Sequence, residues 1–204
     1  MKVSCRPIFE EFLLESYLEH ISNDMLLDEC NHIRSTQESV IRSNVGGYQS
    51  PPLFRHTIQQ YTVLCNLIDS MQGIIDRYIS QYQYPTPRRV DIGNFWLNFN
   101  YRHDSNAYHT HPHSVFSGAY YIKAPENCGT INFYRPYAIA DTEWGHFFSE
   151  SNHSESLLNK LIDRVVPREG KLVMFPSYYP HDVSRSQTDE LRLSLSFNSQ
   201  IHYL

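Results

Sequence analysis

The hydrophobic pattern of the chain changes from a helical period to a strand period near residue 85. In the first part, apolar residues recur three and four positions apart, as on one face of an amphipathic helix: Tyr61, Leu64, Ile68, Met71, Ile75 and Tyr78. A second helix is predicted over Asn23–Ile33. The segment Ser43–Leu53, rich in Gly and Pro, predicts a loop that either connects the helices or covers a site. The prolines of Gln83–Pro87 end the helical part, because a residue before proline avoids the α conformation.

After residue 90, short apolar runs alternate with turn residues, which predicts a sandwich or barrel of short strands. The predicted strands are Asn94–Asn100, Ser117–Ile122, Thr130–Tyr134, Lys171–Phe175, His181–Ser184 and Leu191–Asn198. The segment Tyr137–Asp163 interrupts them, and a helix is predicted over Ser154–Val165. The expected fold is therefore mainly β with N-terminal helices. It forms one domain over 1–204, with helical support in 1–85 and a β core in 90–204 that carries a helical insertion at about 140–165.

The last predicted strand has the sharpest alternation. Leu191, Leu193, Leu195 and Phe197 fall on one face, whereas Arg192, Ser194, Ser196 and Asn198 fall on the other. An exposed sheet face would give the same period, but its polar side is usually rich in Lys and Glu rather than hydroxyl groups with a single arginine. A guanidinium offers a planar fork of donors for a carboxylate, and a serine two residues later can donate to the same group. Arg192 and Ser194 are therefore candidate ligands of an acidic small molecule.

Composition limits the possible partners. The 204 residues are 41% hydrophobic, enough for one domain with a core, and the net charge of -5 gives no basic footprint for nucleic acid. No apolar run is long enough for a membrane span, and the first residues lack the apolar core of a secretory signal, so no membrane partner is expected. The four cysteines, Cys5, Cys30, Cys65 and Cys128, are scattered. We interpret them as reduced thiols of a cytoplasmic protein.

A histidine cluster supplies the candidate metal ligands. His109 and His111 are two positions apart, so an extended strand would point both imidazoles to the same side, within reach of one ion at about 2.0–2.2 Å. His113 continues the spacing, but the intervening Pro112 indicates that the strand ends there, which leaves His113 at the rim. Because the chain has 11 histidines, the cluster alone could be a surface feature that binds nothing. The distant His181, just before the Arg192 strand, favours a metal site.

The stretch from Asn94 to Asn198 resembles the iron(II)- and 2-oxoglutarate-dependent oxygenases, in particular small members from marine bacteria and phages. No single motif is specific, but their order and spacing together are. The matching segments are His109-Thr-His111-Pro, Ser117-Gly-Ala-Tyr-Tyr-Ile122, Gly129-Thr-Ile-Asn-Phe133, Gly170-Lys-Leu-Val-Met-Phe-Pro-Ser177, Pro180-His181-Asp-Val183 and Arg192-Leu-Ser194-Leu-Ser-Phe-Asn198. The resemblance implies a double-stranded β-helix, the jelly-roll or cupin-like barrel.

The resemblance also implies the cofactors and the reaction. Fe(II) would be held by His109 and by the distal His181, and 2-oxoglutarate would be anchored by Arg192 with Ser194. The superfamily has a carboxylate where this chain has His111, so the site would carry one more unit of positive charge. With O2, such enzymes hydroxylate a C–H bond and release succinate and CO2. Further polar candidates on the strands, beside the metal ligands, are Asn98, Asn100, Tyr120 and Asn132.

Two alternatives differ from this interpretation. One is a cupin-like dioxygenase or isomerase with a three-histidine metal and no 2-oxoglutarate. The other is a catalytically silent binding protein on the same barrel. The expected substrate is a small metabolite or an amino-acid-like molecule, and the sequence predicts no oligomeric state.

Overall fold

The computed structural model describes residues 12–80, 88–135 and 162–203. Two α-helices and a short 3-10 helix occupy the first part, and strands dominate the rest, as expected. The elements are β1 (Leu14–Tyr17), α1 (Asn23–Thr36), β2 (Asn44–Val45), β3 (Tyr48–Gln49), η1 (Arg55–Thr57), α2 (Thr62–Ile79), β4 (Arg88–Asn100), β5 (Ser105–His109), β6 (Phe116–Lys123), β7 (Ile131–Tyr134), β8 (Ile162–Val165), β9 (Lys171–Pro176), β10 (His181–Val183) and β11 (Arg192–Tyr203).

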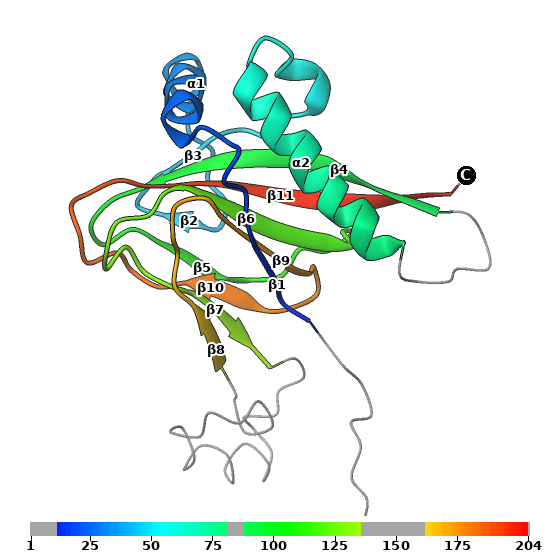
Figure 1. The fold of residues 1–204 in the computed structure, drawn as a ribbon. Coiled ribbons are helices and arrows are strands. Elements are labelled where there is room, and N and C mark those ends of the chain that lie inside the picture. The colour runs from blue at the N-terminus through cyan, green and yellow to red at the C-terminus, as the bar shows by residue number, and fades with distance from the viewer. Residues whose placement is uncertain (1–11, 81–87, 136–161, 204) are drawn as a thin grey trace, which may run out of the picture.

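The strands form two antiparallel sheets. The larger sheet has the order β1-β9-β6-β11-β4-β3, and the smaller has the order β2-β5-β10-β7-β8. Figure 1 shows α1 and α2 on the outer face of the larger sheet, with the smaller sheet on its opposite side. The larger sheet is therefore the middle layer. Within the described residues, no helix is long and apolar enough to cross a membrane.

The alternation predicted for the last strand is confirmed and explains why the helices pack where they do. In β11, Leu193, Leu195 and Phe197 are fully buried in the core beneath the helices. The neighbouring β4 contributes Phe95 and Leu97 to the same core. The apolar face of α2, which includes the predicted Leu64, Ile68, Met71 and Ile75, covers these side chains. Burial of this apolar area is the main force that holds the helical layer on the sheet.

The helical layer is also fixed by one carboxylate. Both oxygens of Glu29, in α1, accept backbone N–H groups at the start of α2, from Val63 at 3.0 Å and from Leu64 at 2.7 Å. These are two of the N–H groups that a helix leaves unpaired in its first turn. A negative charge at this position interacts favourably with the positive end of the helix dipole. Glu29 therefore links α1 to the start of α2.

A second core fills the space between the sheets. Ala119, Tyr121, Val173 and Phe175 of the larger sheet face Ile131, Phe133 and Val165 of the smaller one. The strand β6 is buried on both faces, so its consecutive residues serve different cores. Tyr120 belongs to the core beneath the helices and Tyr121 to the core between the sheets.

The expectation that residues 1–85 are helical support needs correction. The strand β1 pairs with β9 at the edge of the larger sheet. The Ser43–Leu53 segment is not a plain loop either. It contains β2, which pairs with β5, and β3, which pairs with β4. Each of these two strands has only two residues, too few for a period to be visible in the sequence.

The predicted helix Ser154–Val165 is wrong at its C-terminal end. Ile162–Val165 is the strand β8, which pairs with β7 at the edge of the smaller sheet and buries Val165 in the inter-sheet core. The remainder of that helix, and most of the insertion at about 140–165, lie outside the described residues. The strand β5 was also not predicted.

The strand β5 contains a bulge beside β10. His109 lies opposite His181, but Asn106 lies opposite Val183, so β5 uses one residue more than β10 between the two pairs. In a regular strand, residues three apart point to opposite faces. The extra residue turns Asn106 and His109 to the same side of the sheet.

Candidate metal centre

Three predicted histidines converge between the two sheets. His109 ends β5, His111 follows two residues later, and His181 begins β10 directly opposite His109. One nitrogen from each imidazole lies within 4.8 Å of the others, which is the geometry needed to hold a metal ion. His113 is exposed, has a left-handed backbone with φ of 66°, and is outside this group.

Backbone carbonyls orient two of the imidazoles. His109 Nδ1 lies 2.6 Å from Ala107 O, and His181 Nδ1 lies 2.9 Å from Tyr179 O. A carbonyl can only accept, so each Nδ1 carries the proton and each Nε2 keeps its lone pair. This is the arrangement by which proteins commonly fix a metal-binding histidine.

The third imidazole completes the cluster. His111 Nε2 lies 3.2 Å from His181 Nε2. Two metal–nitrogen bonds of about 2.1 Å that meet at about 90–109° would place their nitrogens about 3.0–3.4 Å apart. The observed separation therefore suits two ligands of one ion.

The surroundings keep the three imidazoles neutral. Burial lowers the pKa of His111 to about 3, and the neighbouring imidazoles act in the same direction. Burial also lowers the pKa of His181 to about 4, and that of His109 below its ordinary value. Aromatic rings contribute to this environment, with Phe175 at 4.7 Å from His181 and Trp96 at 5.9 Å from His111 between ring centroids. Neutral imidazoles are the form that binds a metal.

Arg192 lies in the same cavity as the histidines and is 2% exposed. Its Nη1 donates to Cys128 O at 2.6 Å, but its Nη2 is buried and has no hydrogen-bond partner. Burial lowers the pKa of this guanidinium, yet arginine keeps its charge in proteins. A buried, half-satisfied guanidinium is costly, so a bound anionic group is expected to complete it.

A glycine lets the chain approach Arg192. Gly129 follows Cys128, has φ of 89°, and a Cβ there would collide with the Ser184 carbonyl oxygen and lie 3.1 Å from Arg192 Nη1. Only glycine adopts this backbone readily. The glycine thus allows the Cys128 carbonyl oxygen to accept the hydrogen bond from the Arg192 guanidinium.

The histidines and Arg192 line one cavity of about 40 Å³, more than the roughly 10–15 Å³ that a water molecule needs. Ser194 and Asn98, both predicted, line it as well. Asn100 does not; its amide donates to Asn44 Oδ1 at 2.8 Å. The full lining is Ser43, Trp96, Asn98, Asn106, His109, His111, Gly118, Ala119, Tyr121, Ile131, Phe175, His181, Val183, Arg192, Ser194 and Ser196.

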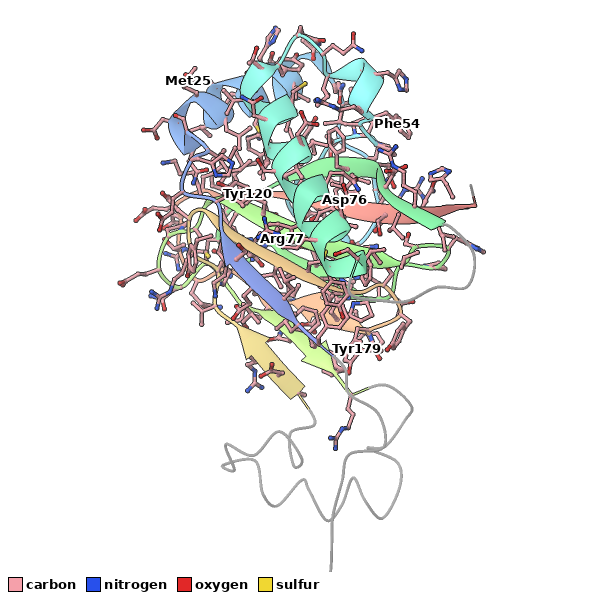
Figure 2. The ribbon with its side chains drawn as sticks, turned by 45° about the vertical axis from the view of Figure 1, so that its right-hand side comes forward. Met25, Phe54, Asp76, Arg77, Tyr120 and Tyr179 are labelled. Carbon is pink, nitrogen blue, oxygen red and sulfur yellow. The ribbon has the colours of Figure 1, made fainter. Side chains whose placement is uncertain are left out.

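Two predicted site residues lie elsewhere. Tyr120 donates to Asn23 Oδ1 at 2.7 Å, on the helix side of the larger sheet, as Figure 2 shows. Asn132 donates to Asp182 Oδ1 at 2.6 Å and is absent from the cavity lining, because its neighbours Ile131 and Phe133 face the space between the sheets instead. Because successive side chains of a strand point to opposite faces, Tyr120 and Asn132 both point away from the cavity.

Several cavity residues were not predicted as site residues from the sequence. Tyr121, next to the predicted Tyr120, carries a phenol whose pKa is raised by burial. Trp96 alternates with the core residues Phe95 and Leu97 of β4, a period that could have found it, and Ser196 lies on the polar face already predicted for the last strand. Asn106 faces the cavity through the bulge, which the sequence does not signal.

Comparison with known proteins decides the family. A family model described as "Putative 2OG-Fe(II) oxygenase" matches residues 94–198, about half of the chain. The chain belongs to the 2OG-Fe(II) oxygenases. It is thus an enzyme of the 2-oxoglutarate-dependent dioxygenase class, with Fe(II) as cofactor and 2-oxoglutarate as co-substrate. No curated protein matches the oxygenase in sequence.

Solved structures confirm the double-stranded β-helix. A prolyl-4-hydroxylase from Pseudomonas putida has a TM-score of 0.63 at 13% identity, with 93% of each chain covered. HygX from Streptomyces hygroscopicus, with nickel and 2-oxoglutarate bound, has a TM-score of 0.60 at 10% identity, covering 93% of this chain and 83% of its own. The epimerase SnoN from nogalamycin biosynthesis has a TM-score of 0.63 at 13% identity, covering 95% and 80%.

Proposed function

We propose that the oxygenase hydroxylates a C–H bond of a small metabolite or amino-acid-like substrate and releases succinate and CO2. The observation that carries the proposal is the unpartnered Nη2 of Arg192 in the same cavity as three converging imidazoles. One feature suits a carboxylate and the other a metal ion, and a 2-oxo acid that chelates iron needs both.

In this proposal His109, His111 and His181 hold Fe(II). Arg192 and Ser194 hold the distal carboxylate of 2-oxoglutarate, a charge-assisted contact for the buried guanidinium. When bound, iron together with 2-oxoglutarate and O2 supplies the oxidising power for the reaction. The protein contributes position, exclusion of water and fixed proton placement at the Nδ1 atoms of His109 and His181.

Two further lining residues, one predicted from the sequence and one new, are candidates for the binding set. Asn98, on the same sheet face as Arg192, is a candidate contact for the co-substrate. Tyr121 pairs with Ser194 in the sheet and replaces Tyr120 as the candidate tyrosine. Its buried phenol keeps its proton and can donate to a carboxylate.

The third imidazole favours one alternative, a three-histidine enzyme that does not use 2-oxoglutarate. A cupin-like dioxygenase or isomerase would need the metal cluster but would leave Arg192 without a function. Hydroxylation also differs from the outcome named for SnoN, an epimerase, so the fold alone does not select it.

The test is anaerobic titration of the purified protein with Fe(II) and then 2-oxoglutarate, monitored for the visible charge-transfer band of the chelate. Appearance of the band, and succinate formation when O2 is admitted, is the expected result. Metal binding without the band and without succinate would favour the cupin-like alternative.

Two broader expectations stay proposals. The whole chain, 1–204, is proposed to act as one oxygenase domain. A cytoplasmic location is proposed because Cys30, Cys65 and Cys128 are free thiols in the structure.

A further inference from the structure

A chain of asparagines leads from the strand β2 to the cavity wall. Asn44 Nδ2 donates to Tyr48 O at 3.2 Å and to Asn98 Oδ1 at 3.3 Å, while Asn44 Oδ1 accepts from Asn100 Nδ2 at 2.8 Å. Asn98 Nδ2 in turn donates to Ser196 Oγ at 3.1 Å. Asn98 and Ser196 line the cavity, whereas Asn44 does not. The chain of hydrogen bonds therefore connects a segment outside the cavity to its wall.

One backbone carbonyl fixes the direction of these hydrogen bonds. The oxygen and nitrogen of an amide side chain are distinguished by the partners they face. The Tyr48 carbonyl can only accept, so the atom of Asn44 that faces it is the nitrogen. The same nitrogen faces Asn98, whose nearer atom must therefore be the oxygen. The other atom of Asn98 is then the nitrogen, which donates to the Ser196 hydroxyl.

The Ser196 hydroxyl thus accepts one hydrogen bond and keeps its own proton for another partner. Within residues 12–80, 88–135 and 162–203, no group accepts that proton. A hydroxyl rotates to suit its partner, and one that already accepts a hydrogen bond donates more strongly. Ser196 therefore offers the cavity a donor rather than an acceptor.

Ser196 lies at the histidine end of the cavity. It pairs in the sheet with Trp96, whose ring centroid is 5.9 Å from that of His111. On its other side it pairs with Ala119, a small residue that also lines the cavity. Arg192 lies four residues earlier on the same face of the strand. The two donors therefore suit opposite ends of one extended ligand.

We propose that Ser196 donates a hydrogen bond to the 2-oxo acid end of the bound co-substrate, and that Asn44 is a positioning residue that directs this donation through Asn98. A 2-oxo acid that binds a metal through its oxo oxygen and one carboxylate oxygen leaves the second carboxylate oxygen as an acceptor. The inference rests on the proposed function, because it assumes that Arg192 and Ser194 hold the distal carboxylate.

The test is anaerobic titration of the Fe(II)-loaded full chain with 2-oxoglutarate, in which the visible charge-transfer band reports the affinity and the surroundings of the chelate. In Ser196→Ala, 2-oxoglutarate should bind on the order of tenfold more weakly, because a donor to a charged oxygen is lost. The band should also shift, and the iron content should not change. Ser196→Thr keeps the hydroxyl on a residue that suits a strand, and its affinity should stay within about twofold of the wild type. Unchanged affinity and an unchanged band in Ser196→Ala would overturn the proposal.

Pyruvate locates the acceptor, since it has the 2-oxo acid end but no distal carboxylate. Ser196→Ala should weaken the binding of pyruvate by about the same factor as that of 2-oxoglutarate. Arg192→Ala is the matched control and should weaken the binding of 2-oxoglutarate alone. A loss in Ser196→Ala that appears with 2-oxoglutarate but not with pyruvate would place the hydroxyl at the distal carboxylate and refute the assignment.

The role of Asn44 is tested by combining two variants. Asn44→Ala frees the Asn98 amide to turn without adding a charge, so 2-oxoglutarate should bind about threefold more weakly. In the Ser196→Ala background the same change should cause no further loss, because residues that act through one contact are not additive. An equal loss in both backgrounds would show that Asn44 acts only on the fold and not through Ser196.

Failure of this inference differs from failure of the proposed function. If the wild type forms the 2-oxoglutarate chelate and Ser196→Ala forms it with the same affinity, only the contact of Ser196 is wrong. If the wild type binds iron but forms no chelate, the proposed function fails as well.

Discussion

The two faces of the larger sheet both contain buried side chains but are chemically opposite. On the helix side, β4 and β11 present Phe95, Leu97 and Leu195, which are 0–1% exposed. On the side facing the smaller sheet, the same strands present Asn98 and Arg192, which are 3% and 2% exposed. One face is filled by apolar packing, whereas the other keeps a cavity, a neutral histidine cluster and an unpaired guanidinium nitrogen.

The difference teaches that burial has two uses within one strand. Apolar residues buried against the helices stabilise the fold in proportion to the area they remove from water. Polar residues buried towards the cavity cost stability and gain binding in return. Substitutions on the two faces should therefore separate stability from ligand affinity, and the predictions below test that separation.

The largest expected effect is loss of the metal from the cavity side. In His181→Ala, Fe(II) affinity should fall by more than about 100-fold, since loss of even an indirect support of a metal ligand costs about 10–100-fold. Metal content after desalting measures the effect. His113→Ala is the control and should retain iron. Equal loss in both variants would mean that the ligand set is wrongly assigned.

Arg192→Ala should weaken 2-oxoglutarate binding while leaving iron in place. Removing one partner of a buried charge pair costs about 2–5 kcal/mol, or roughly 30- to 4000-fold in affinity. Arg192→Lys should recover only part of this, because a point charge does not reproduce the planar fork. Calorimetric titration of the Co(II) protein measures it. Unchanged affinity in a folded, metal-bound Arg192→Ala would favour the cupin-like alternative.

Leu195→Ala should produce the reverse result on the opposite face of the same strand. The side chain is fully buried beneath the helices, and such truncations cost about 2–5 kcal/mol of unfolding free energy. Urea denaturation measures the loss. The affinity for 2-oxoglutarate, tested well below the unfolding transition, should change by less than about twofold. A loss of affinity comparable to that of Arg192→Ala would break the distinction between the faces.

The smallest effect is expected for Ser194→Ala. This removes one hydroxyl donor from the cavity wall, worth about 1 kcal/mol, or roughly fivefold in 2-oxoglutarate affinity. The free energy of unfolding should hardly change, because the Ser194 hydroxyl makes no hydrogen bond to another side chain or to the backbone within the described residues. Titration beside Arg192→Ala gives the ratio of the two contributions. An effect as large as that of Arg192→Ala would contradict the expectation that Arg192 contributes more than Ser194 to 2-oxoglutarate binding.

The parts of the site that were predictable lie on strands with a visible period. Alternation in the last strand correctly separated Leu193 and Leu195 from Arg192 and Ser194, because one face is apolar and the other polar. In that strand local sequence and tertiary packing agree. His109 and His111 were predicted from their two-residue spacing and both lie in the cluster, although β5 ends at His109 and His111 lies beyond it.

The rest could not be predicted where local sequence lacks a period. Tyr120 and Tyr121 lie in a strand buried on both faces, so nothing in the sequence indicates which of them faces the cavity. The helix assigned up to Val165 failed because an edge strand of four residues is defined by its partner β7, not by its own pattern. The two-residue strands at Asn44 and Tyr48 exist only through long-range pairing.

The bulge in β5 decides which side chains of that strand reach the cavity wall. Because one extra residue lies between Asn106 and His109, both face the cavity although they are three residues apart. A regular strand of the same sequence, with His109 still opposite His181, would turn Asn106 to the other side of the sheet. One irregularity of the backbone thus gives the oxygenase an amide in the cavity wall beside its metal ligand.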